Sequence, residues 1–183
     1  MTAAIEIVAA LPEDRVALAN MMQLYTHDFS EFWAGGSRGE LGGNGLFAVY
    51  PLDAWWREPD HIPLLVKVGG FLAGFALLDG MSHTGWPLDR NMAEFFIVRK
   101  HRRSGIGAAA AREIFTRYPG RWETAVARAN QGALAFWRAA IHPLAEDVDL
   151  IDVDSPSWNG PVLRFRINTP NVIPAKAGTH LPS

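Results

Sequence analysis

Cysteine is absent from the 183 residues of the sequence. Disulfides, thiolate nucleophiles, cysteine-ligated zinc and iron–sulfur clusters are therefore excluded. Long apolar runs are absent as well, because no stretch approaches the roughly 18 residues that span a bilayer. The first residues, Met1 to Glu6, have neither the basic segment nor the apolar stretch of a secretion signal. We expect a soluble cytoplasmic protein that has no membrane partner.

An excess of positive charge is also lacking. Lys and Arg number 17 against 19 Asp and Glu, which gives a net charge of -2. A general nucleic-acid binder is normally basic, so this partner is disfavoured. The six histidines show no metal-ligand spacing, and no Gly-x-Ser-x-Gly sequence occurs. Metal and serine-hydrolase chemistry are therefore unsupported by the sequence.

What the sequence does contain is material for one packed domain. Hydrophobic residues make up 49% of the chain and include seven Trp and ten Phe. The apolar periodicity predicts a strand, two helices, three strands, a helix, a strand, a helix and two strands, in that order. Gly69 and Gly70 lie between two apolar runs and predict a hairpin, and Asn130 is expected to cap the last helix. We expect the domain to cover residues 1–168 and an unstructured tail to cover residues 169–183.

One segment after a predicted strand has the pattern of an anion-binding site. Arg99, Lys100, Arg102 and Arg103 follow the strand that ends near Val98, and two glycines at 105 and 107 then open a helix that Ser104 would cap. Backbone N–H groups at a helix start are unsatisfied and carry partial positive charge, so they bind phosphate well. A solvated basic turn is the alternative. The Walker sequence is missing, and the spacing disfavours a dinucleotide-binding loop.

Two motifs in this region resemble those of a known family. Arg102-x-x-Gly105-x-Gly107 is similar to the Arg/Gln-x-x-Gly-x-Gly/Ala motif of the GNAT superfamily of N-acetyltransferases, and Asn130-x-x-Ala133-x-x-Phe136-Trp137 resembles its second motif. The segment 25–32 resembles a bacterial group within the superfamily that has no firm substrate. The resemblance implies an α/β fold with a mixed, mostly antiparallel central sheet of about seven strands and helices on both faces.

The same resemblance implies acetyl-coenzyme A as the acyl donor and an amine as the acceptor. The backbone near Ile97 and Val98 would pair with the pantetheine arm, and Asn130, Phe136 and Trp137 would lie along its other side. The pyrophosphate would bind at the loop and helix start formed by Arg102, Arg103, Ser104, Gly105, Ile106, Gly107 and Ala108. The acceptor is a small molecule or a protein amine, and a homodimer is compatible with the family.

Direct transfer to an amine requires a base, and many members of the family place one on the strand that ends at Val98. Glu94 shares a face of this strand with Phe96 and Val98 and is the candidate; contact with Arg90 or solvent is the alternative. Trp137 stands where many members have a tyrosine acid, but a thiolate leaving group tolerates the absence of an acid.

The sequence gives little indication of which residues bind the acceptor. Asp28, Glu31 and Glu40, with Trp55 and Trp56, would suit a cationic amine, but a solvated helix face with core tryptophans is favoured. Two alternatives to an enzyme stay open. One is a non-catalytic coenzyme A-binding module, and the other is a polyanion or nucleic-acid binder that uses the segment 99–103.

Overall fold

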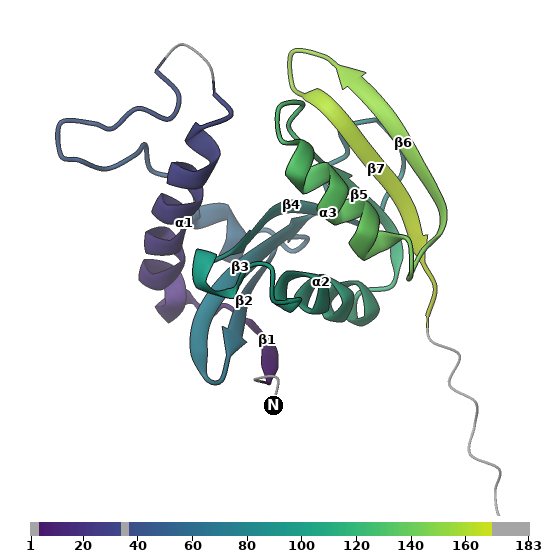
Figure 1. Cartoon of the computed structure of the whole chain (residues 1–183), viewed down its shortest axis with the longest axis horizontal. Helices are drawn as coiled ribbons and strands as arrows, with labels where there is room; N and C mark the ends of the chain where they lie inside the picture. The colour runs from purple at the N-terminus through teal and green to yellow at the C-terminus, as the bar shows by residue number, and fades with distance from the viewer. Residues whose placement is uncertain (1–3, 34–36, 170–183) are drawn as a thin grey trace, which may run out of the picture.

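The computed structural model describes residues 4–33 and 37–169, which form one seven-stranded sheet with helices on both faces (Figure 1). The expected order of elements and the expected fold class are both confirmed. Except for Thr169, the expected tail lies outside the described residues. The elements are β1 (Ile5–Ala9), η1 (Pro12–Asp14), α1 (Arg15–Ser30), η2 (Asp53–Trp56), β2 (Ile62–Val68), β3 (Phe71–Asp79), β4 (Arg90–Ile97), η3 (Arg99–His101), α2 (Ile106–Arg117), β5 (Gly120–Ala125), α3 (Gln131–Ile141), β6 (Glu146–Asp154) and β7 (Asn159–Ile167).

The sheet is mostly antiparallel, with the strand order β1-β2-β3-β4-β5-β7-β6. The hairpin between β2 and β3 turns at Gly69 and Gly70, whose φ angles of 58° and 80° are costly for residues that carry a Cβ. Only β4 and β5 run parallel to each other. They are joined through α2, as a parallel connection requires.

Each face of the sheet is covered by a different helical layer (Figure 1). Leu64 and Val66 of β2 point into a core shared with α2 and α3, which we call the α2/α3 core. The alternate residue Leu65 packs with Phe75 into a second core under α1, which we call the α1 core. The side chains of a strand alternate between the two faces, so apolar residues at consecutive positions indicate a strand that is buried on both.

A β-bulge changes this alternation in β4. Along β3 the pairing advances by one residue, from Leu77 opposite Glu94 to Leu78 opposite Met92, whereas β4 advances by two. Ala93 is therefore the extra residue. Met92 lies in the α2/α3 core, while Phe96 lies in the α1 core. The bulge thus allows Met92 and Glu94, two positions apart, to face opposite sides of the sheet.

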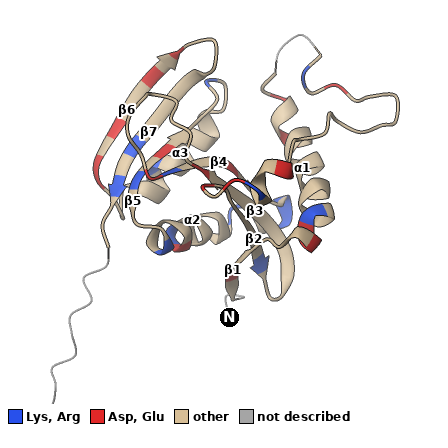
Figure 2. Cartoon of the chain, turned by 180° about the vertical axis from the view of Figure 1, so that it is seen from behind, with Lys and Arg blue, Asp and Glu red and all other residues tan. Residues whose placement is uncertain are grey.

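A row of polar side chains crosses five strands. In register, Asp79 lies opposite Asn91, Asn91 beside Glu123, Glu123 opposite Arg164, and Arg164 opposite Asp149. The first three are buried, and the row reaches solvent at Asp149. Figure 2 shows the outer end of this row, where acidic residues along β6 lie beside basic residues along β7. No helix in residues 4–33 and 37–169 is long and apolar enough to cross a membrane.

Candidate functional site

The two parallel strands pair only where they begin. Arg90 lies beside Trp122 and Asn91 beside Glu123, and no further pairs join β4 to β5 within the described residues. Farther along, β4 is paired with β3 alone, so the other edge of β4 has no strand partner. We call this unpaired stretch between β4 and β5 the gap. Unpaired backbone groups at such an edge can bind an extended ligand as a further strand would bind.

The backbone groups that face this gap belong to Ile97 rather than Val98. Val98 donates its N–H to the carbonyl of Ala73 on the β3 side, at 2.8 Å. Because successive residues of an antiparallel pair present their polar groups to opposite edges, the N–H and carbonyl of Ile97 point to the gap. The carbonyl accepts a hydrogen bond from Nε of Arg102 at 2.6 Å, so the N–H is the group left for a ligand. Of the two residues expected to pair with a ligand, the structure thus leaves Ile97 in position to do so and engages the N–H of Val98.

Glu94 lies on the α1 face of β4, as expected, and it contacts α1. The Tyr25 hydroxyl donates a hydrogen bond of 2.5 Å to Oε2 of Glu94. The Tyr25 ring packs edge-on against Phe75 and Phe96, which fixes the position of its hydroxyl. Of the expected alternatives, the contact with Arg90 does not occur within the described residues, while Glu94 is partly exposed.

Burial raises the pKa of Glu94 from 4.5 to about 7, although hydrogen bonds from Tyr25 and Tyr50 oppose the change. The charge of Arg38 also lowers the pKa, whereas the charge of Asp79 raises it. Burial, followed by the charge of Glu94, raises the pKa of Tyr25 well above 10, so Tyr25 remains a hydrogen-bond donor. A carboxylate with a pKa near 7 can both accept and release a proton near neutral pH.

The segment between β4 and α2 presents six consecutive backbone N–H groups. Within the described chain, the amides from Arg103 to Ala108 donate no hydrogen bond, whereas those of Arg102 and Ala109 do. The backbone is left-handed at Arg103 (φ 59°) and at Gly105 (φ 83°). Alternating left-handed residues turn successive amides toward one side and form a concavity that binds anions.

The helix cap differs from the expectation. The N-cap of α2 is Gly105, not Ser104, and the Ser104 hydroxyl instead donates to the carbonyl of His101 at 2.7 Å. A left-handed cap favours glycine, because a Cβ would be strained there. As a result, no side chain occupies the amides at the start of the helix. Ile106, the first helical residue, is buried in the α2/α3 core and anchors the loop.

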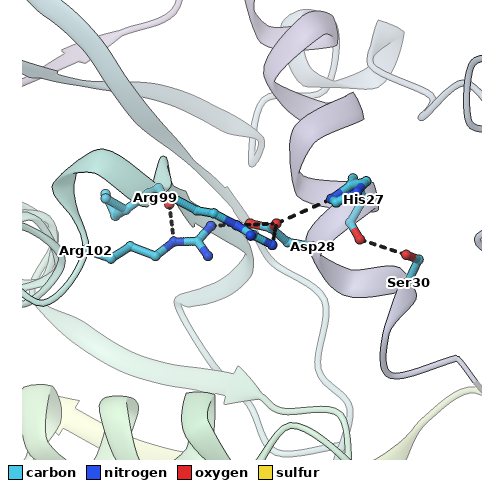
Figure 3. Close-up of polar contacts among 6 residues, drawn as sticks. His27, Asp28, Ser30, Arg99 and Arg102 are labelled. Atoms are coloured by element: carbon cyan, nitrogen blue, oxygen red, sulfur yellow. Dashed lines mark hydrogen bonds and ion pairs between the residues drawn. The ribbon is translucent and has the colours of Figure 1, made fainter.

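Arg102 and Arg99 bind a carboxylate of α1 (Figure 3). Arg99 donates from Nη2 and Nε to Oδ1 of Asp28, at 2.7 and 3.1 Å, and Arg102 pairs with Oδ2. Partial burial opposes ionisation, but hydrogen bonds from Arg102 and Arg99 lower the pKa of Asp28. Arg102 also donates from Nε to the carbonyl of Ile97 at 2.6 Å. These contacts hold the end of α1 against the loop.

Helix α3 borders the loop from the other side. Asn130 caps this helix as expected, since its Oδ1 accepts the N–H of Ala133 at 2.9 Å. Phe136 lies against Gly107, where an added Cβ would be 3.3 Å from its ring. Trp137 is buried and contacts the rings of Phe95 and Phe115. Phe136 therefore borders the loop, whereas Trp137 belongs to the α2/α3 core.

The residues considered for a cationic acceptor are dispersed. Asp28 is engaged by the two arginines, Trp55 is buried, and Trp56 donates its indole N–H to the carbonyl of Ala10. Glu31 is exposed. No group of three or more His, Asp or Glu suited to a metal occurs within residues 4–33 and 37–169. The sequence interpretation assigned no role to Tyr25 and Tyr50, the partners of Glu94; the spacing of Tyr25 on the apolar stripe of α1 was the only signal available.

The comparisons with known proteins agree with this architecture. Residues 18–140 match the Acetyltransferase (GNAT) family, about two thirds of the chain. The chain belongs to the GNAT acetyltransferase family. Proteins of this family transfer acyl groups. No curated protein matches the sequence.

Solved structures of GNAT acetyltransferases share the fold at low sequence identity. An acetyltransferase from Thermus thermophilus is 14% identical with a TM-score of 0.65, covering 92% of this chain and 100% of its own. PaiA N-acetyltransferase from Thermoplasma acidophilum, in complex with coenzyme A, is 14% identical with a TM-score of 0.52, covering 89% and 99%. Aminoglycoside acetyltransferase AAC(6')-Ib, in complex with coenzyme A and kanamycin, is 13% identical with a TM-score of 0.56, covering 90% and 95%.

Proposed function

We propose that the protein is an N-acetyltransferase that moves the acetyl group of acetyl-coenzyme A directly to a primary amine. The observation that carries this proposal is Glu94, a partly buried carboxylate with a pKa of about 7 on the strand whose open edge ends at the anion loop. Glu94 precedes Ile97 by three residues, which is about 10 Å along a strand. A base and an extended ligand on Ile97 would therefore lie within one small site.

The residues present suit a coenzyme A molecule. Six unpaired amides between Arg103 and Ala108 provide donors for a pyrophosphate, and Gly105 and Gly107 let it approach the backbone. The backbone of Ile97 would pair with the pantetheine arm, and Asn130 and Phe136 would border it. Because Arg99 and Arg102 are bound to Asp28, we assign the phosphates to the amides, supplemented by the charges of Lys100 and Arg103.

Glu94 would take the proton that the amine must lose. Most primary amines are protonated at neutral pH, so removal of this proton precedes or accompanies attack. Acetyl-coenzyme A supplies the activated thioester. The new N–C bond forms as the C–S bond breaks, sulfur keeps the electron pair, and the proton passes from nitrogen to Glu94 and then to solvent. Trp137 offers no acid, and a thiolate with a pKa near 8.5 can leave without one.

Thermal denaturation with and without acetyl-coenzyme A tests the binding step. A ligand at one hundred times its Kd stabilises the native state by about 2.7 kcal/mol. Gly107→Asp, which places a negative charge at the amides, should abolish the increase in melting temperature. Gly107→Ala separates crowding against Phe136 from charge and should retain part of it. Ala139→Asp, on the exposed side of α3, should leave it unchanged.

Release of free thiol in the presence of a panel of amines tests the reaction itself. We expect amine-dependent release by the wild-type protein. Stabilisation by acetyl-coenzyme A without release on any amine would instead support a non-catalytic coenzyme A-binding module. Equal stabilisation of the wild type and Gly107→Asp would contradict the assigned loop.

A further inference from the structure

The surface beside Glu94 is a ladder of aromatic rings along α1. Tyr25, whose hydroxyl binds Glu94, is followed by Phe29 one helical turn later and by Phe32 and Trp33 just beyond the end of α1. The ring centroids are 5.4 Å apart for both Tyr25–Phe29 and Phe29–Trp33, and Phe32 lies 5.5 Å from Phe29. We call these four rings the α1 ladder. A continuous apolar surface therefore begins at the candidate base.

The outer part of the α1 ladder is not part of the folded interior. Phe29, Phe32 and Trp33 belong to neither the α1 core nor the α2/α3 core, and all three are partly exposed. Tyr25, in contrast, packs against the α1 core. Partly exposed aromatic rings next to a candidate catalytic group commonly bind the apolar portion of a ligand.

A positive charge lies at the far end of the ladder. The guanidinium carbon of Arg38 is 4.3 Å from the centroid of the Trp33 ring. Within the described chain, Arg38 forms no ion pair with a carboxylate. Its charge nevertheless acts on Glu94 and Tyr25.

Of the acidic groups near the site, Asp28 and Asp79 are engaged, whereas Glu31 and Glu40 are exposed and form no ion pair within the described residues. Asp28 is held by Arg99 and Arg102. Asp79 is buried and accepts the side-chain amide of Asn91 at 2.9 Å and the N–H of Met81 at 3.0 Å. The ladder therefore runs from a carboxylate that can accept a proton to an exposed, unpaired cation. This arrangement disfavours a second positive charge on the acceptor and favours a negative one.

We propose that the acceptor is an amine with a carboxylate at its other end, joined by an apolar body that lies along the α1 ladder from Glu94 to Arg38. The proposal rests on the acetyl transfer proposed above and names its substrate class. The amine reaches Glu94, the body packs on Phe29 and Trp33, and Arg38 binds the carboxylate. Polycationic amines are the class that this arrangement disfavours.

Three acceptors that differ only in charge test the proposal. 4-(Aminomethyl)benzoate, its carboxamide, and 1,4-bis(aminomethyl)benzene share one ring and one aminomethyl group, and their second substituents are negative, neutral and positive. We expect kcat/KM to fall by about fivefold at each step, the upper value for a partly exposed ion pair. Arg38→Gln should remove these differences between acceptors, whatever its effect on the common rate, and Arg38→Lys should retain part of them.

Arg112→Gln is the matched control. Arg112 is an exposed arginine of α2, on the opposite side of the sheet from α1. This variant should preserve the wild-type order of the three acceptors. A wild-type preference for the diamine, or a preference for the carboxylate that persists in Arg38→Gln, would overturn the proposal.

A binding measurement separates this proposal from the proposed function. Saturation-transfer NMR on the protein with coenzyme A detects bound acceptor without turnover. The same order of binding, lost in Arg38→Gln, would support the substrate class even if no thiol were released, which would then contradict the transferase function alone. Thiol release with no dependence on acceptor charge would contradict the substrate class alone.

Discussion

Glu94, which is partly buried, and Glu123, which is fully buried, are two carboxylates on adjacent central strands that point to the same face of the sheet. Glu123 accepts three hydrogen bonds, from the Ser82 hydroxyl at 2.9 Å, the His83 N–H at 2.7 Å and the Thr84 hydroxyl at 2.5 Å. All three donors belong to the loop between β3 and β4. Glu94 instead depends on tyrosine hydroxyls, and burial dominates its pKa.

The difference shows how one residue type acquires two roles. Three hydrogen bonds join the carboxylate of Glu123 to the loop, so it fastens the loop to the sheet. The loop in turn brings His83 against Trp158. The burial of Glu94 is only partly compensated, so its charged form is costly and its proton affinity rises. Incomplete compensation of a buried charge is a feature of functional sites.

The largest expected effect separates the two residues by activity. Glu94→Gln keeps the shape but cannot accept a proton, so turnover should fall by roughly 10²–10⁴-fold. Affinity for acetyl-coenzyme A, measured by thermal shift, should be nearly unchanged, and higher pH should recover part of the rate. In the wild type, kcat/KM should rise with pH through about 7. A variant that binds the cofactor and turns over at the wild-type rate would refute Glu94 as the base.

Glu94 should also influence stability with pH. Its pKa in the folded state, about 7, lies above the unfolded value near 4.5, so the native state binds more protons between these values. The stabilising contribution is present below about pH 4.5 and is lost as pH rises through 7. Relative to the wild type, Glu94→Gln should therefore gain stability from pH 5 to pH 8. Parallel denaturation curves across this range would contradict the raised pKa.

The second effect is on stability and concerns Glu123. Glu123→Ala leaves three donors without an acceptor and should lower the free energy of unfolding by about 3–5 kcal/mol. Glu123→Gln retains one carbonyl acceptor and should cost less. Urea denaturation measures both, and the activity per folded molecule should stay closer to wild type than in Glu94→Gln. A stable Glu123→Ala protein would show that the loop is held by other contacts.

A smaller effect tests the contact between α1 and the base. The hydrogen bond from Tyr25 lowers the pKa of Glu94, so Tyr25→Phe should raise it and move the acidic limb of the kcat/KM profile to higher pH. Loss of about 1 kcal/mol of hydrogen bonding raises the pKa by about 0.7 and corresponds to a roughly threefold lower rate at pH 7. At high pH the rate should return to that of the wild type. An unshifted acidic limb would separate Tyr25 from the ionisation of Glu94.

The smallest expected effect gives a baseline for the others. Removal of residues 169–183 touches neither carboxylate and should leave the free energy of unfolding within about 0.5 kcal/mol of the full chain. Urea denaturation of both forms measures the difference. A larger loss would show that this segment packs and that the domain extends past residue 168.

Local chemistry accounts for what the sequence could predict. The Asn130 cap, the Gly69-Gly70 turn and the order of elements depend on neighbours in the chain, and each is confirmed. The cap at Ser104 was wrong because a left-handed Gly105 fits the turn better. Contacts between distant segments carry no comparable signal. Tyr25 and Glu94 are 69 positions apart, and Asp28 is 71 positions from Arg99.

The contact of Asp28 with the two arginines also bears on polyanion binding. From composition, the segment 99–103 offers four basic side chains. In the structure, Arg99 and Arg102 share the carboxylate of Asp28, which leaves Lys100 and Arg103 as its unpaired cations within the described chain. Fewer free cations release fewer counterions on binding a polyanion, so the affinity of this surface for nucleic acid is weakened.

The extra residue in β4 determines how the base must be located in any related strand. In a regular strand, side chains at alternate positions point to the same face of the sheet. The extra residue Ala93 shifts this alternation by one position between Arg90 and Ile97. Removing one residue there would turn either the buried Met92 or the base to the wrong side of the sheet. In an alignment or a grafted strand, positions should therefore be counted backward from Ile97. A count forward from Arg90 would place Glu94 on the face of the α2/α3 core.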